Sequence, residues 1–248
     1  MNSLGIFILF ISAFSTVDCV VAAPVSFSSP VQQATLIELY TSEGCSSCPP
    51  ADSWLSQFKD NEHLWTQIVP VSFHVDYWDN LGWRDRFSSA EFSRRQYQYK
   101  QHNHLDVIYT PGIMRNGREW RGWFNAEKLV LKTGERVGTL EIAINNDNAT
   151  ANFEPATHRR EALTLNVALL GFQLTSNVAA GENSGKLLSH DFVVLRFRQQ
   201  NAAPQRDRYQ WQLKNMLSDS PDKAQALALW VSETNDPTPL QATGGWLK

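Results

Sequence analysis

Short apolar runs and a helical periodicity alternate in the first half of the chain. The run Ala34–Tyr40 has the length of a strand, and Ile68–Val75 predicts a second strand. Between them, apolar residues from Ala51 to Phe58 recur at helical spacing. A strand, a helix and a strand in this order predict a parallel unit with the helix on one face of the sheet. Pro70 predicts an edge position for the second strand, because proline donates no ladder hydrogen bond.

A second helix is predicted from Ser88 to about His104. Ser88 with Glu91 three residues later forms a capping box, the usual start of a helix. We expect Arg94 and Arg95 to lie on the solvated face of this helix, because charged side chains are rarely buried.

A hairpin and a last helix should follow. Asn116-Gly117 is a strong signal for a tight turn, and it separates the short strands Gly112–Arg115 and Arg118–Gly122. Asn125 is a favourable helix cap, and Gly134 is a favourable helix end.

The pattern changes after about Val137, where alternating apolar runs occur without helical periodicity. Turn residues separate these runs, for example between Gly181 and Gly185. Strands without helices predict an all-β sandwich over residues 138–248. The predicted strands are Leu163–Leu169, Phe192–Arg198, Tyr209–Lys214 and Ala226–Val231.

The first residues predict a signal peptide over residues 1–23. Leu4–Phe14 is an apolar run of the right length, and small residues end the segment at Ala22-Ala23. The run is too short for an ordinary membrane-spanning helix, and no later segment approaches that length. We therefore expect an exported protein, periplasmic or secreted, without a stable membrane span.

Composition and charge narrow the classes of partner that we expect this protein to bind. The chain has 248 residues, a formal net charge of -3 and a pI near 6.1. Nucleic-acid surfaces need clustered Lys and Arg, so we expect no nucleic-acid partner. A protein or a small-molecule thiol or disulfide is the expected substrate, and we predict no cofactor.

Cys45-Ser46-Ser47-Cys48 follows the first predicted strand directly and precedes the first predicted helix. A strand that delivers a Cys-x-x-Cys pair to a helix start is the arrangement of thioredoxin-like redox proteins. The helix start favours the thiolate form, and the spacing suits a reversible disulfide. A static structural disulfide is the alternative. Cys19 lies in the predicted leader, so an intramolecular disulfide of the exported protein must join Cys45 to Cys48.

Three phrases of the sequence carry a resemblance to a known family. The stretch Thr41–Asp52 surrounds the Cys pair, Phe73–Asp79 ends the second strand, and Tyr109-Thr110-Pro111 precedes the hairpin. Together they resemble domain of unknown function 1223, an exported thioredoxin-like family. The resemblance implies an α/β thioredoxin-like domain over residues 32–137, followed by the β-sandwich domain. It also implies that Pro111 is a cis proline beside the Cys pair.

The sequence departs from thioredoxins at one buried position. Thioredoxins carry an acid in the first strand six residues before the nucleophilic cysteine, and Leu39 occupies that position here. Glu38 should face the opposite side of the strand, because side chains alternate along it. Proton transfer to the second cysteine would then need another group.

Candidate site residues surround the Cys pair. His74 and Asp76 share one face at the end of the second strand, and they are candidate proton shuttles or a hydrogen-bonded structural pair. Thr110, Tyr77 and Trp78 are candidate substrate-binding residues, although aromatic loops also pack under their own fold.

We predict a thiol-disulfide oxidoreductase in which Cys45 attacks, Cys48 resolves the mixed disulfide and Pro111 completes the site. Two non-enzymatic alternatives stay open. One is a copper-handling protein that uses Cys45, Cys48 and His74, since thiolates select Cu(I). The other is a structural thioredoxin-like scaffold that recruits partners. No resident metal is predicted for the oxidoreductase.

Overall fold

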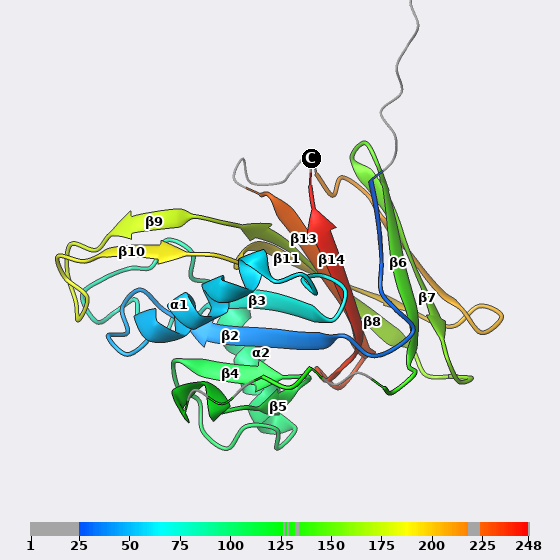
Figure 1. The fold of residues 1–248 in the computed structure, drawn as a ribbon, viewed down its shortest axis with the longest axis horizontal. Helices are drawn as coiled ribbons and strands as arrows, with labels where there is room; N and C mark the ends of the chain where they lie inside the picture. The colour runs from blue at the N-terminus through cyan, green and yellow to red at the C-terminus, as the bar shows by residue number, and fades with distance from the viewer. Residues whose placement is uncertain (1–24, 126, 128, 132–133, 218–223, 248) are drawn as a thin grey trace, which may run out of the picture.

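The structure is a computed structural model that describes residues 25–125, 127, 129–131, 134–217 and 224–247. Its largest element is an eight-stranded sheet that runs through the centre of the molecule (Figure 1). The strands of this sheet, in spatial order, are β14 (Pro239–Trp246), β13 (Ala226–Glu233), β8 (Leu163–Gly171), β11 (Val193–Ala202), β3 (Ile68–His74), β2 (Thr35–Thr41), β4 (Gly112–Arg115) and β5 (Arg118–Glu119).

The other strands of the described residues form two smaller sheets. A four-stranded sheet has the order β1 (Val25–Ser28), β6 (Gly138–Asn145), β7 (Asn148–Pro155) and β12 (Tyr209–Leu213). A hairpin pairs β9 (Leu174–Asn177) with β10 (Leu187–His190).

The predicted strand-helix-strand unit is present. Strands β2 and β3 pair in parallel, and α1 (Pro49–Ser56) connects them with a 3₁₀ turn, η1 (Gln57–Asp60). The second helix, α2 (Ala90–Gln101), begins one residue later than the capping box predicted, because Ser89 is the cap and accepts a hydrogen bond from the Glu91 N–H.

The predicted hairpin is confirmed. Strands β4 and β5 pair antiparallel, and Asn116 and Gly117 between them both have positive φ, at 47° and 78°. Such a turn matches the twist of the strands. The predicted helix from Asn125 to Gly134 lies partly outside the described residues. A 3₁₀ turn, η2 (Gly122–Asn125), stands at its start, and residues 127, 129–131 and 134 are not helical.

The predicted edge position of β3 is wrong, because β3 lies between β2 and β11. Its pairing with β11 is parallel and limited to Ser72 opposite Val193. Ser72 donates its backbone N–H to Phe192 at 2.8 Å. Pro70 therefore lies outside the short paired segment, and its missing N–H breaks no ladder bond to β11.

The two α-helices cover opposite faces of the sheet. Asp52 of α1 contacts Thr41 of β2, whereas Arg95 of α2 contacts Glu38 of the same strand. Residues three apart on a strand point to opposite faces. In Figure 1, α1 accordingly lies in front of β2 and β3, and α2 lies behind them.

Two hydrophobic cores share the strands β8 and β13. Trp230 of β13 packs on the α2 face, together with Phe73 and Phe197. Leu229, its neighbour on β13, points to the other face, where the four-stranded sheet packs and Trp211 is buried. Alternation along each of these strands therefore supplies side chains to both cores.

The predicted α/β thioredoxin-like fold class is wrong. The protein is mostly β, with 44% strand and 13% helix, and the described residues contain two α-helices. The reason is that β8, β11, β13 and β14 extend the sheet of β2, β3, β4 and β5 instead of forming a detached layer. The strand-rich second half is compatible with the predicted β-sandwich, since one sheet packs on another there.

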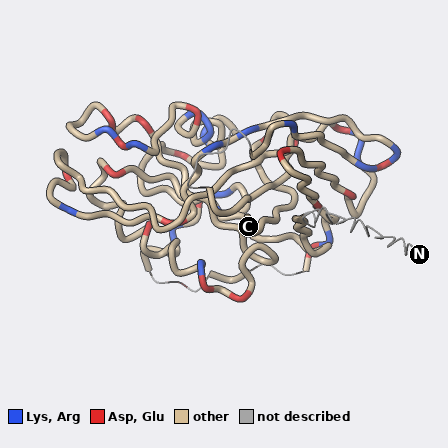
Figure 2. Tube along the Cα trace, turned by 90° about the horizontal axis from the view of Figure 1, so that it is seen from above, with Lys and Arg blue, Asp and Glu red and all other residues tan. Residues whose placement is uncertain are grey.

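The predicted boundary near residue 137 stays a prediction, and the large sheet continues across it. The predicted signal peptide over residues 1–23, which contains Cys19, lies outside the described residues, so export stays a prediction as well. Among the described residues, no helix is both long and apolar enough to cross a membrane. Figure 2 shows acidic and basic residues interspersed along the trace.

Candidate functional site

Cys45 and Cys48 form a disulfide at the start of α1. Their Cα atoms are 5.4 Å apart. Cys48 is the cap of the helix, and Pro49 and Pro50 occupy its first turn, where a missing N–H costs nothing. Cys45 and Cys48 are 1% and 0% exposed, whereas Ser46 and Ser47 between them are exposed. The disulfide is therefore covered, although the turn that carries it lies at the surface.

A segment from the second half of the chain holds this turn. We call residues 181–186 the docked loop. The buried side-chain amide of Asn183 donates to the backbone carbonyls of Glu43 and Cys45, both at 2.9 Å. The carboxylate of Glu182 accepts from the Ser46 N–H at 2.9 Å. The sequence predicted a turn between Gly181 and Gly185 but not its position, because nothing local connects it to a segment 138 residues earlier.

Trp78 and Thr110 lie together near the Cys turn. The indole N–H of Trp78 donates to the Thr110 hydroxyl at 2.8 Å. A Cβ added to Gly44, the residue before Cys45, would be 3.2 Å from the Trp78 Cβ. The Thr110–Pro111 peptide bond is cis, and Gly112 pairs with Tyr40 of β2. Three predicted site residues thus adjoin the strand and the turn that lead to Cys45.

Tyr77 and Asp76 are directed to α2 instead. The Tyr77 hydroxyl donates to the side-chain carbonyl of Gln96, and the Asp76 carboxylate accepts from the Ser93 hydroxyl. Burial raises the pKa of Tyr77 well above its ordinary value, so this phenol stays protonated. These contacts anchor the loop after β3 to the helix.

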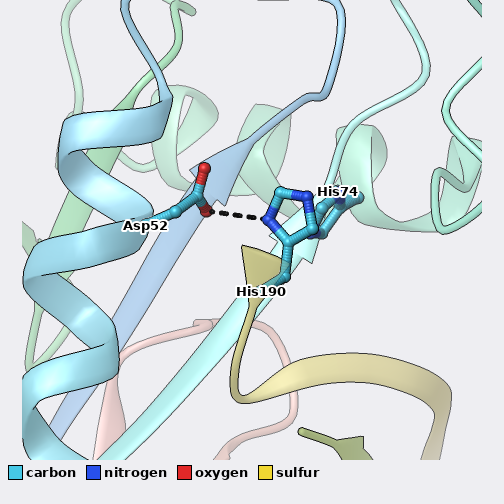
Figure 3. Close-up of side chains that lie close together, drawn as sticks. All are labelled: Asp52, His74 and His190. Carbon is cyan, nitrogen blue, oxygen red and sulfur yellow. Dashed lines mark ion pairs between the residues drawn. The ribbon is translucent and has the colours of Figure 1, made fainter. Parts of the chain in front are cut away.

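His74 is fully buried and belongs to a second group of polar residues. Its Nδ1 is 2.6 Å from the Asp85 carboxylate. On its other side are Asp52 of α1 and His190 of β10, as Figure 3 shows. Glu43 adjoins the group, with Oε1 3.5 Å from His190 Nε2. The sequence indicated His74 but not the other members, which lie on four separate segments.

Electrostatics in this group are dominated by burial and close opposite charges. Burial alone would lower the pKa of His190, but the nearby carboxylates of Asp52 and Glu43 raise it to about 9. Burial alone would raise the pKa of Asp85, but the charge and hydrogen bond of His74 hold it below its ordinary value. The pKa of Glu43 is lowered as well, by hydrogen bonding against the effect of burial, so Glu43 and Asp85 stay ionised inside the protein.

A separate buried ion pair lies under α2. Arg95 donates from Nε to Glu38 Oε2 at 2.7 Å and from Nη2 to Oε1 at 3.0 Å. The Tyr99 hydroxyl also donates to Glu38. The prediction of a solvated Arg95 is wrong, because Glu38 points to this face and requires a cation, while Arg94 is exposed as predicted.

The fold and the site define a mostly β protein with a covered Cys-x-x-Cys disulfide at the start of a short helix. A family model described as "Protein of unknown function (DUF1223)" matches residues 36–232, and the chain belongs to this family.

Two solved structures share the fold. One is a crystal structure of a protein from Agrobacterium tumefaciens, 24% identical, with a TM-score of 0.63 over 86% of this chain and 95% of the other. The second is HBP35 of Porphyromonas gingivalis, 16% identical, with a TM-score of 0.58 over 87% of this chain and 76% of the other. At these identities the likeness concerns the fold alone. No curated protein matches the sequence.

Proposed function

We propose that this protein is a thiol-disulfide oxidoreductase whose reacting pair is Cys45 and Cys48. The observation that carries the proposal is the disulfide itself, which joins the two cysteines at the cap of α1. Partial positive charge at a helix N-terminus stabilises a thiolate released there. Trp78 and Thr110 supply aromatic and polar groups next to the turn for a substrate.

The exchange proceeds in two balanced steps. The Cys45 thiolate of the reduced protein attacks a substrate disulfide, forms a mixed disulfide and releases one substrate thiolate. The Cys48 thiolate then attacks Cys45 Sγ, expels the second substrate thiolate and restores the Cys45–Cys48 bond. Two electrons pass from the protein to the substrate, and the reverse sequence oxidises a substrate dithiol.

Redox titration with variants tests this proposal. The pair should equilibrate between about -120 and -270 mV, the range of redox-active protein disulfides. Cys48→Ser should trap a one-to-one mixed disulfide with a model disulfide, visible by intact mass, and Cys45→Ser should trap none. Ser46→Ala is the matched control, because its exposed side chain leaves the turn intact.

A potential below about -300 mV would instead identify a structural disulfide. The same conclusion would follow if Cys45→Ser exchanged as fast as the unmodified protein.

The docked loop should control how fast the disulfide is reduced. Asn183→Ala removes two hydrogen bonds to the Cys turn, together about 1–3 kcal/mol. Because Cys45 is 1% exposed, a reductant reaches it only after local opening, which these bonds oppose. We expect reduction by dithiothreitol to be about tenfold faster, measured by alkylation of the released thiols.

Ser184→Ala is the control, since the hydroxyl of Ser184 donates to the carbonyl of Ala179, just before the loop, and not to the Cys turn. Equal rates for Asn183→Ala and the unmodified protein would show that the docked loop does not limit access.

A further inference from the structure

Asp52, His74 and His190 converge on one point inside the protein. They come from α1, from the end of β3 and from the end of β10, and Figure 3 shows their side chains directed toward one another. One ligand atom from each lies within 4.8 Å of the others. The residues are 6%, 0% and 2% exposed, so the meeting point is shielded from solvent.

His74 is held so that one ring nitrogen has no protein partner. Its Nδ1 is 2.6 Å from Asp85 Oδ2, and its buried Nε2 makes no hydrogen bond. A neutral imidazole that donates from Nδ1 presents a lone pair at Nε2. A carboxylate behind the ring is the usual support of a metal-binding histidine.

His190 lies between two carboxylates. Its Nε2 is 3.5 Å from Glu43 Oε1, and its Nδ1 is 3.8 Å from Asp52 Oδ1. Neither ring nitrogen makes a hydrogen bond, and the two histidine rings lie 4.9 Å apart. Buried polar atoms without partners are costly, so this group calls for a ligand.

Asp52 is oriented in the same way. Its Oδ2 accepts from the Thr41 hydroxyl at 3.1 Å, while its Oδ1 is the oxygen that faces His190. Each of the three side chains therefore has a protein group behind it and an atom directed to the common point.

We propose that Asp52, His74 and His190 bind one divalent first-row cation of the Zn²⁺ type. Two imidazole nitrogens and one carboxylate oxygen suit such a cation, and the fourth tetrahedral position is left to a non-protein ligand. Ligand atoms of tetrahedral Zn²⁺ lie about 3.3 Å apart, so the side chains need to close by up to about 1.5 Å. The cation also offsets the buried carboxylates of Glu43, Asp52 and Asp85.

This site is independent of thiol chemistry. Asp52 lies one helical turn after Cys48, and its N–H donates to the Cys48 carbonyl at 3.1 Å. Both cysteines are engaged in the disulfide, so the site as built contains no thiolate. Metal binding to the oxidised protein therefore separates this inference from the proposed oxidoreductase function.

The test is a calorimetric titration of the chelator-treated, oxidised full chain with Zn²⁺. Metal analysis of the loaded protein then gives the stoichiometry. We expect one Zn²⁺ per chain. Asp85→Asn should weaken binding about 10–100-fold, the usual effect of losing a supporting carboxylate, and Asp52→Asn and His190→Gln should weaken it further. His63→Gln is the matched control, because this partly exposed histidine lies outside the group.

Two further measurements keep the result independent of how the variants fold. Co²⁺ bound to the unmodified oxidised chain should give visible d–d bands without a thiolate charge-transfer band. The Cys45→Ser/Cys48→Ser double variant should bind Zn²⁺ as tightly as the unmodified chain. Absence of stoichiometric Zn²⁺ binding, a thiolate band, or unchanged affinity in folded Asp52→Asn and His190→Gln proteins would overturn the proposal.

Discussion

Replacement of Arg95 by methionine should lower the free energy of unfolding by about 3–5 kcal/mol. The guanidinium makes two hydrogen bonds to Glu38, and the residues are 3% and 0% exposed. Without Arg95, the buried Glu38 carboxyl group would keep hydroxyl donors alone. Methionine keeps much of the packing volume against Trp230, so the loss should report mainly the missing charge.

Urea unfolding followed by circular dichroism measures this effect. Arg94→Met is the matched control, because Arg94 lies next to Arg95 on the same helix and is exposed. We expect its free energy of unfolding to change by no more than about 0.5 kcal/mol. The double variant Glu38→Gln/Arg95→Met should recover part of the loss, since it leaves no unpaired charge. If Arg95→Met and Arg94→Met were equally stable, the buried pair of Arg95 and Glu38 would not contribute to stability as expected here.

Trp211→Ala should lower the free energy of unfolding by about 3–5 kcal/mol. We expect the Cys-containing half of the protein to be destabilised as much as the half that contains Trp211. Trp211 of β12 is 0% exposed and packs in the core between the four-stranded sheet and the large sheet. The strands β8 and β13 line this core and also the core under α2. Loss of packing on one face should therefore be transmitted through shared strands to the other.

Coincident transitions would establish this coupling. In the reduced protein, alkylation of Cys45 and Cys48 and circular dichroism should give the same lowered urea midpoint. Trp246→Ala removes the same side chain from a 42% exposed position and should have a smaller effect. An unchanged alkylation midpoint in Trp211→Ala would show that the Cys-containing half unfolds independently.

Local patterns predicted individual elements well. β3 was predicted as Ile68–Val75 and is Ile68–His74, and the Asn116-Gly117 turn is where it was expected. These features depend on residues a few positions apart, whose alternation or turn preference acts without the rest of the chain.

The continuous sheet could not be predicted, because its central junction has almost no sequence signal. β3 and β11 meet through one register pair, Ser72 and Val193, which are far apart in the chain. The run Leu163–Leu169 alternates in the same way whether its strand joins a separate sandwich or the large sheet. The fold class was therefore wrong although many strands were right.

The interior charges were partly predictable. Glu38 is an acid inside an apolar strand-like run, and a buried carboxylate requires a cation, so a partner on α2 could have been expected. The group around His74 gave no comparable signal. Asp52 and His190 look like ordinary polar residues, and only the packing of β10 against α1 brings them to His74.

The contact between Asn183 and Cys45 sets an order of events during synthesis. The two residues are 138 positions apart, so a ribosome adding about 5–20 residues per second makes Asn183 roughly 7–28 s after Cys45. In that interval both thiols are exposed on an incomplete chain and can react with any oxidant or partner they meet. The Cys pair becomes enclosed only after Asn183 has been made, so its first oxidation can precede the enclosure that we expect to limit its reduction.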